Sequence, residues 1–129
     1  MVFQITALYA LPLALLGLVL WFRVTIMRSN LNVSIGEKGD QNLLLKIRQH
    51  GNFIEWVPLM LVLMMIAEGN GAGAWVHISG AFIVIGRFAH PFGLKIDKAS
   101  HPLRYVGNIS SLIALLNVMI CIIITSAKL

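Results

Sequence analysis

Long apolar runs separated by short polar segments are the main feature of this chain. No Asp, Glu, Lys or Arg occurs in residues 1–22 or 105–127, and further apolar runs occupy 56–67 and most of 69–86. A helix rises about 1.5 Å per residue, so roughly 20 apolar residues cross the hydrocarbon core of a bilayer. The pattern predicts an all-α protein with four membrane-spanning helices, at approximately 2–27, 42–68, 73–92 and 101–127.

The second helix is the least obvious of the four. Its apolar run is too short to cross a bilayer alone, so a spanning helix must begin near Leu43 and carry polar residues towards the membrane. Asp40 stands where it can cap this helix. The connections at 29–40, 68–73 and 93–101 are polar or rich in glycine, and we expect loops there. Such loops join the helices into an antiparallel, up-down bundle.

The lysines and arginines are distributed unevenly along the chain. The group around the first connection is Arg23, Arg28, Lys38, Lys46 and Arg48, and the group around the third is Arg87, Lys95, Lys98 and Arg104. With four spans, these two connections share one side of the membrane, which the positive-inside rule identifies as cytosolic. Both chain termini are then expected on the non-cytosolic side.

The composition is typical of a membrane protein. Hydrophobic residues make up 58% of the chain and charged residues 12%, whereas soluble domains carry about 25% charged residues. We therefore treat residues 1–129 as one transmembrane domain in contact with lipids. The net charge of +5 follows from membrane topology and does not indicate a nucleic-acid partner. Basic residues beside a membrane also attract anionic headgroups or an anionic substrate.

Polar side chains lie near the cytosolic ends of three predicted helices. Two helices repeat an i, i+4, i+7 spacing, which places each set on one helix face. The sets are Arg48, Asn52 and Glu55 on the second helix and Arg104, Asn108 and Ser111 on the fourth. Charged groups in a spanning helix are costly unless they pair or reach water, so we expect Glu55 to pair with Arg87 or Arg104 of a neighbouring helix. The result is an arginine-rich cleft open to the cytosol.

The same residues also allow a structural interpretation. Buried Arg–Glu pairs and Asn or Ser contacts hold membrane helices together, and Arg48 and Arg104 can extend to the headgroups. The histidines are not paired at metal-ligand spacing, so we predict no metal site. Cys121 is the single cysteine and lies in an apolar run, where a thiol is unreactive.

Three segments resemble the MAPEG family, the membrane-associated proteins of eicosanoid and glutathione metabolism. Residues 48–58 (RQHGNFIEWVP) resemble the family's second-helix signature, and residues 86–90 (GRFAH) its third-helix motif. Residues 101–104 (HPLR) resemble the segment that opens the fourth helix with a catalytic arginine. The resemblance extends over essentially the whole chain and includes the number and order of the helices.

The resemblance implies a glutathione-dependent transferase or peroxidase that acts on hydrophobic electrophiles or lipid hydroperoxides. It also implies a homotrimer with a glutathione site between adjacent subunits, and the short chain is similar to bacterial members of an inner membrane. Carried over by position, the residues that bind glutathione are Arg48, Asn52, Glu55, Arg87 and His90. Arg104 is then the catalytic residue, which stabilises the glutathione thiolate.

Two positions depart from the family pattern. Gly51 stands where several relatives carry another arginine, and Leu94 where synthase-type members have a tyrosine beside the thiol. Both departures argue against eicosanoid synthase chemistry, and the sequence leaves open whether Tyr105 replaces that tyrosine. It also leaves open a non-catalytic scaffold or lipid-binding protein of the same fold. A small transporter would more often show broken helices or an internal repeat, and we find no convincing repeat.

The charge distribution makes a prediction about orientation. A reporter fused after Leu129 is expected to show a non-cytosolic terminus, because both basic connections then face the cytosol. A cytosolic signal from this fusion would reverse the orientation and separate the arginine-rich cleft from cytosolic thiols.

Overall fold

The computed structural model describes residues 3–127, and this part of the chain is helical with no strand. The helices are α1 (Gln4–Leu31), α2 (Gln41–Gly69), α3 (Val76–Gly93) and α4 (Pro102–Ser126), with a short 3₁₀ turn, η1 (Gly73–Trp75), before α3. The predicted all-α class is confirmed. The first helix continues four residues past its expected end, which shortens the first loop.

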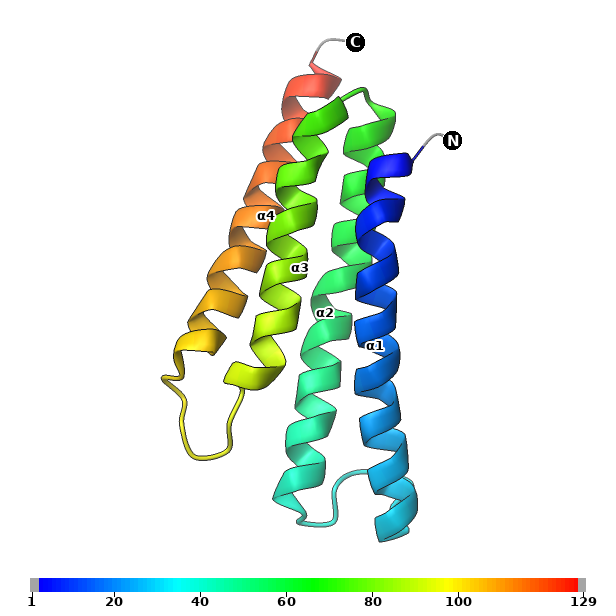
Figure 1. Ribbon diagram of the computed structural model, residues 1–129, viewed down its shortest axis with the longest axis vertical. Coiled ribbons are helices and arrows are strands. Elements are labelled where there is room, and N and C mark those ends of the chain that lie inside the picture. The colour runs from blue at the N-terminus through cyan, green and yellow to red at the C-terminus, as the bar shows by residue number, and fades with distance from the viewer. Residues whose placement is uncertain (1–2, 128–129) are drawn as a thin grey trace.

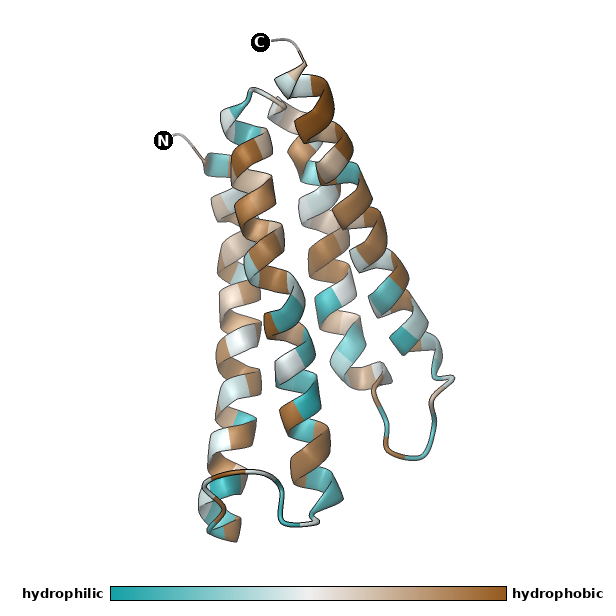
Figure 2. Cartoon of the chain, turned by 180° about the vertical axis from the view of Figure 1, so that it is seen from behind, coloured by the Kyte–Doolittle hydropathy of each residue, from teal (hydrophilic) through white to brown (hydrophobic). Residues whose placement is uncertain are grey.

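The four helices run alternately up and down (Figure 1). The α1–α2 and α3–α4 loops lie at one end of the bundle, which we call the loop end. The α2–α3 connection, the start of α1 and the end of α4 lie at the other end. Hydrophilic positions gather in the half of α2, α3 and α4 nearest the loop end, whereas the opposite half is largely hydrophobic (Figure 2).

This is an integral membrane protein in which three of the described helices, α1, α2 and α4, are long and apolar enough to cross a membrane. The third helix has only 18 residues, and Arg87, His77 and His90 interrupt its apolar sequence. Helix α3 instead packs against all three other helices, most extensively against α4. Of the four predicted membrane-spanning helices, three therefore have the length and composition of a span.

Side chains cap the starts of α1 and α2. The cap of α2 was expected from the sequence, whereas the cap of α1 was not. The Asp40 carboxylate accepts a hydrogen bond from the Leu43 N–H at 2.8 Å, which confirms the predicted cap of α2. At the start of α1, the N-cap residue Phe3 makes no side-chain capping bond to the described residues. Instead, the carboxylate of Glu68, at the end of α2, accepts hydrogen bonds from the N–H groups of Ile5 and Thr6 and from the Thr6 hydroxyl. This carboxylate joins the two helices at the end opposite the loops.

Glycines allow α3 and α4 to approach closely. A Cβ atom on Gly107 of α4 would lie 2.7 Å from His90 Cβ and 2.9 Å from His90 Cα, both of which belong to α3. A Cβ on Gly93 would overlap the backbone of Leu103 and Arg104. The backbones therefore meet where no side chain fits, and this contact fixes the distance between His90 and the start of α4.

We predict that Gly107→Ala destabilises the protein by about 1–3 kcal/mol, because the added methyl group forces α3 and α4 apart. Gly51→Ala is the matched control, since its Cβ would meet only Arg48 Nη1 at 3.7 Å and alanine favours a helix. Melting temperatures in detergent should fall for the first variant and stay level or rise for the second. Equal melting of the two variants would contradict the close contact.

Candidate functional site: a basic cavity between α2, α3 and α4

A cavity of about 190 Å³ lies near the loop end, between α2, α3 and α4. Its lining side chains are Arg48 and Asn52 of α2, His90 and Leu94 at the end of α3, and Arg104 and Asn108 of α4. Four of the six residues that sequence reasoning placed at a site therefore meet around one space. The lining contains two guanidinium groups, two amides and an imidazole, and no carboxylate.

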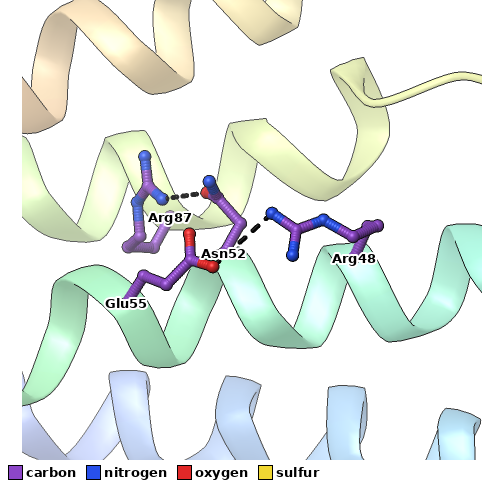
Figure 3. A network of polar contacts seen from close by, with 4 residues as sticks. All are labelled: Arg48, Asn52, Glu55 and Arg87. Atoms are coloured by element: carbon purple, nitrogen blue, oxygen red, sulfur yellow. Dashed lines mark hydrogen bonds and ion pairs between the residues drawn. The ribbon is translucent and has the colours of Figure 1, made fainter.

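Arg87 lies behind this cavity and is 1% exposed. Its Nη1 donates to Asn52 Oδ1 at 2.6 Å (Figure 3). Its Nη2 donates to the Gly107 carbonyl at 2.9 Å and to Ser111 Oγ at 2.6 Å. The Trp56 ring lies beside the guanidinium, with Cζ 5.3 Å from the ring centroid, which is within the range of a cation–π contact. One cation thus joins three helices, and its donors are directed into the bundle.

The Arg87 contact determines what Asn52 can offer to a ligand. Because Asn52 Oδ1 accepts from Arg87, the amide nitrogen of Asn52 remains available as a hydrogen-bond donor. A donor beside two arginines suits an acceptor group such as a carboxylate. Arg87 therefore orients a cavity residue without lining the cavity itself.

The expected partner of Glu55 was wrong. Glu55 Oε1 lies 3.5 Å from Arg48 Nη2 of its own helix (Figure 3). Within the described residues, neither Arg87 nor Arg104 forms an ion pair with it. Residues seven apart lie two turns apart on one helix face, and the long Arg48 side chain bridges that distance. Arg87 is already occupied by Asn52, Ser111 and the Gly107 carbonyl. Glu55 thus lies at the edge of the cavity, with its side chain 53% exposed.

Arg104 is held by the start of α4. One of its nitrogens, Nη1, donates to the Ala99 carbonyl at 3.2 Å, and the residue lies in the first helical turn. His101 caps this turn through Nδ1, which accepts from the Leu103 N–H at 3.2 Å. The positive end of the α4 dipole and the guanidinium therefore favour a negative charge at the same place. No group of three or more His, Cys, Asp or Glu side chains that could hold a metal ion occurs within residues 3–127.

Sequence reasoning missed several residues that build the cavity. Gln49 Nε2 donates to the Pro91 carbonyl at 2.7 Å and ties α2 to the end of α3 beside His90. Trp56 and the Gly107 carbonyl also surround Arg87. Ser111 was placed on the face of Arg104, but it is fully buried and accepts from Arg87. Its spacing from Arg104 was visible in the sequence, whereas its partner on α3 required the fold.

The fold and the cavity define a small all-helical integral membrane protein with a basic cavity between its helices. The chain belongs to the MAPEG family, whose sequence pattern matches residues 6–124. It is 41% identical over 91 residues to inner membrane protein YecN of Escherichia coli strain K12, and the alignment covers 70% of each chain. The same values hold for inner membrane protein YecN of Escherichia coli O6:H1 strain CFT073. No solved structure matches the chain.

The buried contact of Arg87 predicts different effects for two asparagines of the cavity. Asn52→Leu should lower the free energy of unfolding by about 1–3 kcal/mol, because it leaves Nη1 of the buried Arg87 guanidinium without its acceptor. Asn108→Leu is the control, since the Asn108 side chain is exposed and makes no hydrogen bond in the described part of the chain; its effect should stay within about 0.5 kcal/mol. Melting in detergent compares them, and equal losses would show that the Arg87–Asn52 bond contributes nothing.

Proposed function

We propose that this protein binds glutathione in the basic cavity and transfers its thiolate to hydrophobic electrophiles or uses it to reduce lipid hydroperoxides. The observation that carries the proposal is the meeting of Arg48, Arg104 and two amide side chains around a space whose lining contains no carboxylate. Membership of a family with glutathione-dependent members supports the same ligand.

The chemistry of glutathione suits the cavity. The tripeptide has two carboxylates, which guanidinium groups bind through paired hydrogen bonds, and the donor of Asn52 adds a third contact. Its ammonium group is suited to Glu55, the one carboxylate at the edge. Arg87 supports this arrangement from behind by holding Asn52, so we assign it a positioning role.

Arg104 is the proposed catalytic residue. A nearby cation stabilises a thiolate and raises the fraction of glutathione in its nucleophilic form. Arg104 uses one nitrogen for the Ala99 carbonyl, which leaves further N–H groups for the sulfur. The thiolate attacks the electrophilic carbon and expels its leaving group, or attacks a hydroperoxide oxygen and releases the alcohol. In the peroxidase reaction, the first step leaves a glutathione sulfenic acid, and the thiol of a second glutathione then displaces water from it to form the disulfide.

An apolar cavity supplies space for the second substrate. It measures about 180 Å³, lies between α2 and α4, and is lined by Glu55, Trp56, Leu59, Met60 and Leu115. Glu55 belongs to this cavity and also pairs with Arg48 of the basic cavity, so the two spaces are adjacent along α2. A hydrophobic electrophile that dissolves in the bilayer would reach this space from the side.

The site is incomplete in one subunit, which supports a homotrimer with the site between subunits. Ligand sites normally enclose about 300–1,000 Å³, and the basic cavity is smaller. Arg48 and Glu55 are more than half exposed on an apolar helix, where contact with lipid would be costly. A second copy over this face would shield the pair and enlarge the cavity. We further propose that α3 provides a fourth crossing, that the loop end faces the cytosol, and that the protein resides in a bacterial inner membrane.

A non-catalytic scaffold or lipid-binding protein of the same fold is the second candidate. It is favoured by Arg87, whose donors join three helices inside the bundle and show that an arginine here can serve packing alone. Under this interpretation glutathione would not bind, and Arg48 and Arg104 would contact headgroups.

The two arginines of the cavity should give different kinetic signatures. Removing the carboxylate contact in Arg48→Leu should chiefly raise KM for glutathione, whereas Arg104→Leu should chiefly lower kcat and raise the pKa of the bound thiol. Thiolate absorbance and turnover of a chlorinated aromatic electrophile, measured across pH, report both effects. Arg104→Lys should retain more activity than Arg104→Leu, because it keeps the charge.

Glutathione binding is tested in the same variants by thermal melting in detergent. At 100 times Kd, glutathione should stabilise the wild-type protein by about 2.7 kcal/mol. If glutathione does not shift wild-type melting and no turnover occurs, the scaffold is the better explanation. If Arg104→Leu folds normally with unchanged turnover and thiol pKa, Arg104 is not the catalytic residue.

A further inference from the structure

A second basic recess lies on the α1–α2 hairpin at the loop end and shares no residue with the basic cavity. It has a volume of about 410 Å³ and is lined by Arg23, Ile26, Met27, Asn30 and Leu31 of α1 and by Lys46 of α2. We call it the α1–α2 groove. Its floor is apolar, and its two charged side chains are both cations.

Within residues 3–127, the two cations of the groove have no anionic partner. The Lys46 ammonium contacts only the Met27 thioether, at 3.0 Å, and Arg23 donates to no other side chain or carbonyl within residues 3–127. The neighbouring cations differ from them, because Arg28 donates to the carbonyls of Ser34 and Gly36 and Lys38 donates to that of Asn32. Arg23 and Lys46 are therefore free to bind an external anion.

Their depth places these cations near lipid phosphates. Arg23 lies about 28 Å along the helix axis from Gln4, close to the roughly 30 Å thickness of the hydrocarbon core. Lys46 lies beside Met27, one turn further on, where the headgroup region begins. Acyl chains have a matching surface, because the exposed apolar residues of α1 continue from the groove towards the membrane centre at helical spacing. These residues are Ile26, Phe22, Val19 and Leu15.

We propose that the α1–α2 groove binds an acidic phospholipid. The phosphate and acidic headgroup contact Arg23 and Lys46, Asn30 donates to the headgroup, and one acyl chain extends from Ile26 along the exposed face of α1. A neutral phospholipid has the same chains but offers no net negative charge to two unpaired cations, so the site prefers acidic lipids.

Native mass spectrometry of the full-length protein tests the site, using phosphatidylglycerol and phosphatidylcholine with identical acyl chains. Wild-type protein should prefer phosphatidylglycerol, and the double variant Arg23→Gln/Lys46→Gln should bind it roughly 30-fold more weakly, about fivefold for each cation. Lys95→Gln/Lys98→Gln is the matched control, since it removes two charges from the other basic loop; its affinity should change less than twofold. Arg23→Gln alone should bind phosphatidylglycerol about fivefold more weakly, and this single variant replaces the double variant if the latter does not fold.

Three outcomes would overturn the proposal. Equal losses in both double variants would show diffuse attraction of acidic lipid to a basic surface. An unchanged preference in Arg23→Gln/Lys46→Gln would place the lipid elsewhere. Competition by inorganic phosphate or glycerol phosphate as strong as by the intact lipid would identify a soluble anion site, because the acyl chain would then contribute nothing.

Discussion

A buried guanidinium group determines how the loop-end half of this bundle is built. Arg87 lies in a helix packed against the three others, and burying its charge without partners would cost more than a small membrane bundle can supply. Asn52 from α2 and Ser111 and the Gly107 carbonyl from α4 accept from its two terminal nitrogens, whereas Nε has no partner in the described part of the chain. The same contacts bring α4 against α3, which requires glycine at the closest approach. The positions of Asn52, His90 and Arg104 around the basic cavity follow from this packing.

The two ends of the bundle use polar groups differently. At the end opposite the loops, Glu68 caps α1, Tyr9 contacts His77 at 2.9 Å, and Asn117 bridges Trp75 and Ser79. These polar groups bond to one another or to the backbone, as buried groups in a membrane must. At the loop end, Arg48, Glu55 and Asn108 remain exposed, and Arg23 and Lys46 have no anionic partner among the residues that the structure describes. Unused bonding capacity is therefore concentrated where a ligand, a lipid or a second subunit can reach it.

The sequence predicted the helices well, because spans, loops and the Asp40 cap are recorded in local patterns of hydrophobicity and turn residues. Four of the six residues that the sequence placed at a site line the basic cavity, because helical spacing fixes which side chains share a face of each helix. Sequence reasoning failed for contacts that depend on how helices pack. The partner of Glu55 was sought on another helix, although Arg48 lies on the same face. The contacts of Arg87 with Asn52, the Gly107 carbonyl and Ser111 likewise became visible only in the fold. Glu68 as the cap of α1 joins residues more than 60 positions apart, which no local pattern reveals.

Two proposed anion sites at one end of a bundle raise the question of why lipid headgroups would not fill the glutathione site. The answer lies in Glu55. Its exposed carboxylate, 3.5 Å from Arg48, places a negative charge at the edge of the basic cavity, where it repels a phosphate diester and attracts an ammonium group. Glutathione carries both signs of charge, whereas phosphatidylglycerol carries only one. The lining of the α1–α2 groove has no such carboxylate. Its cations would therefore accept any acidic phospholipid whose acyl chains are long enough to follow α1. The position of a single acid would thus separate the proposed ligands of two basic sites on neighbouring helices.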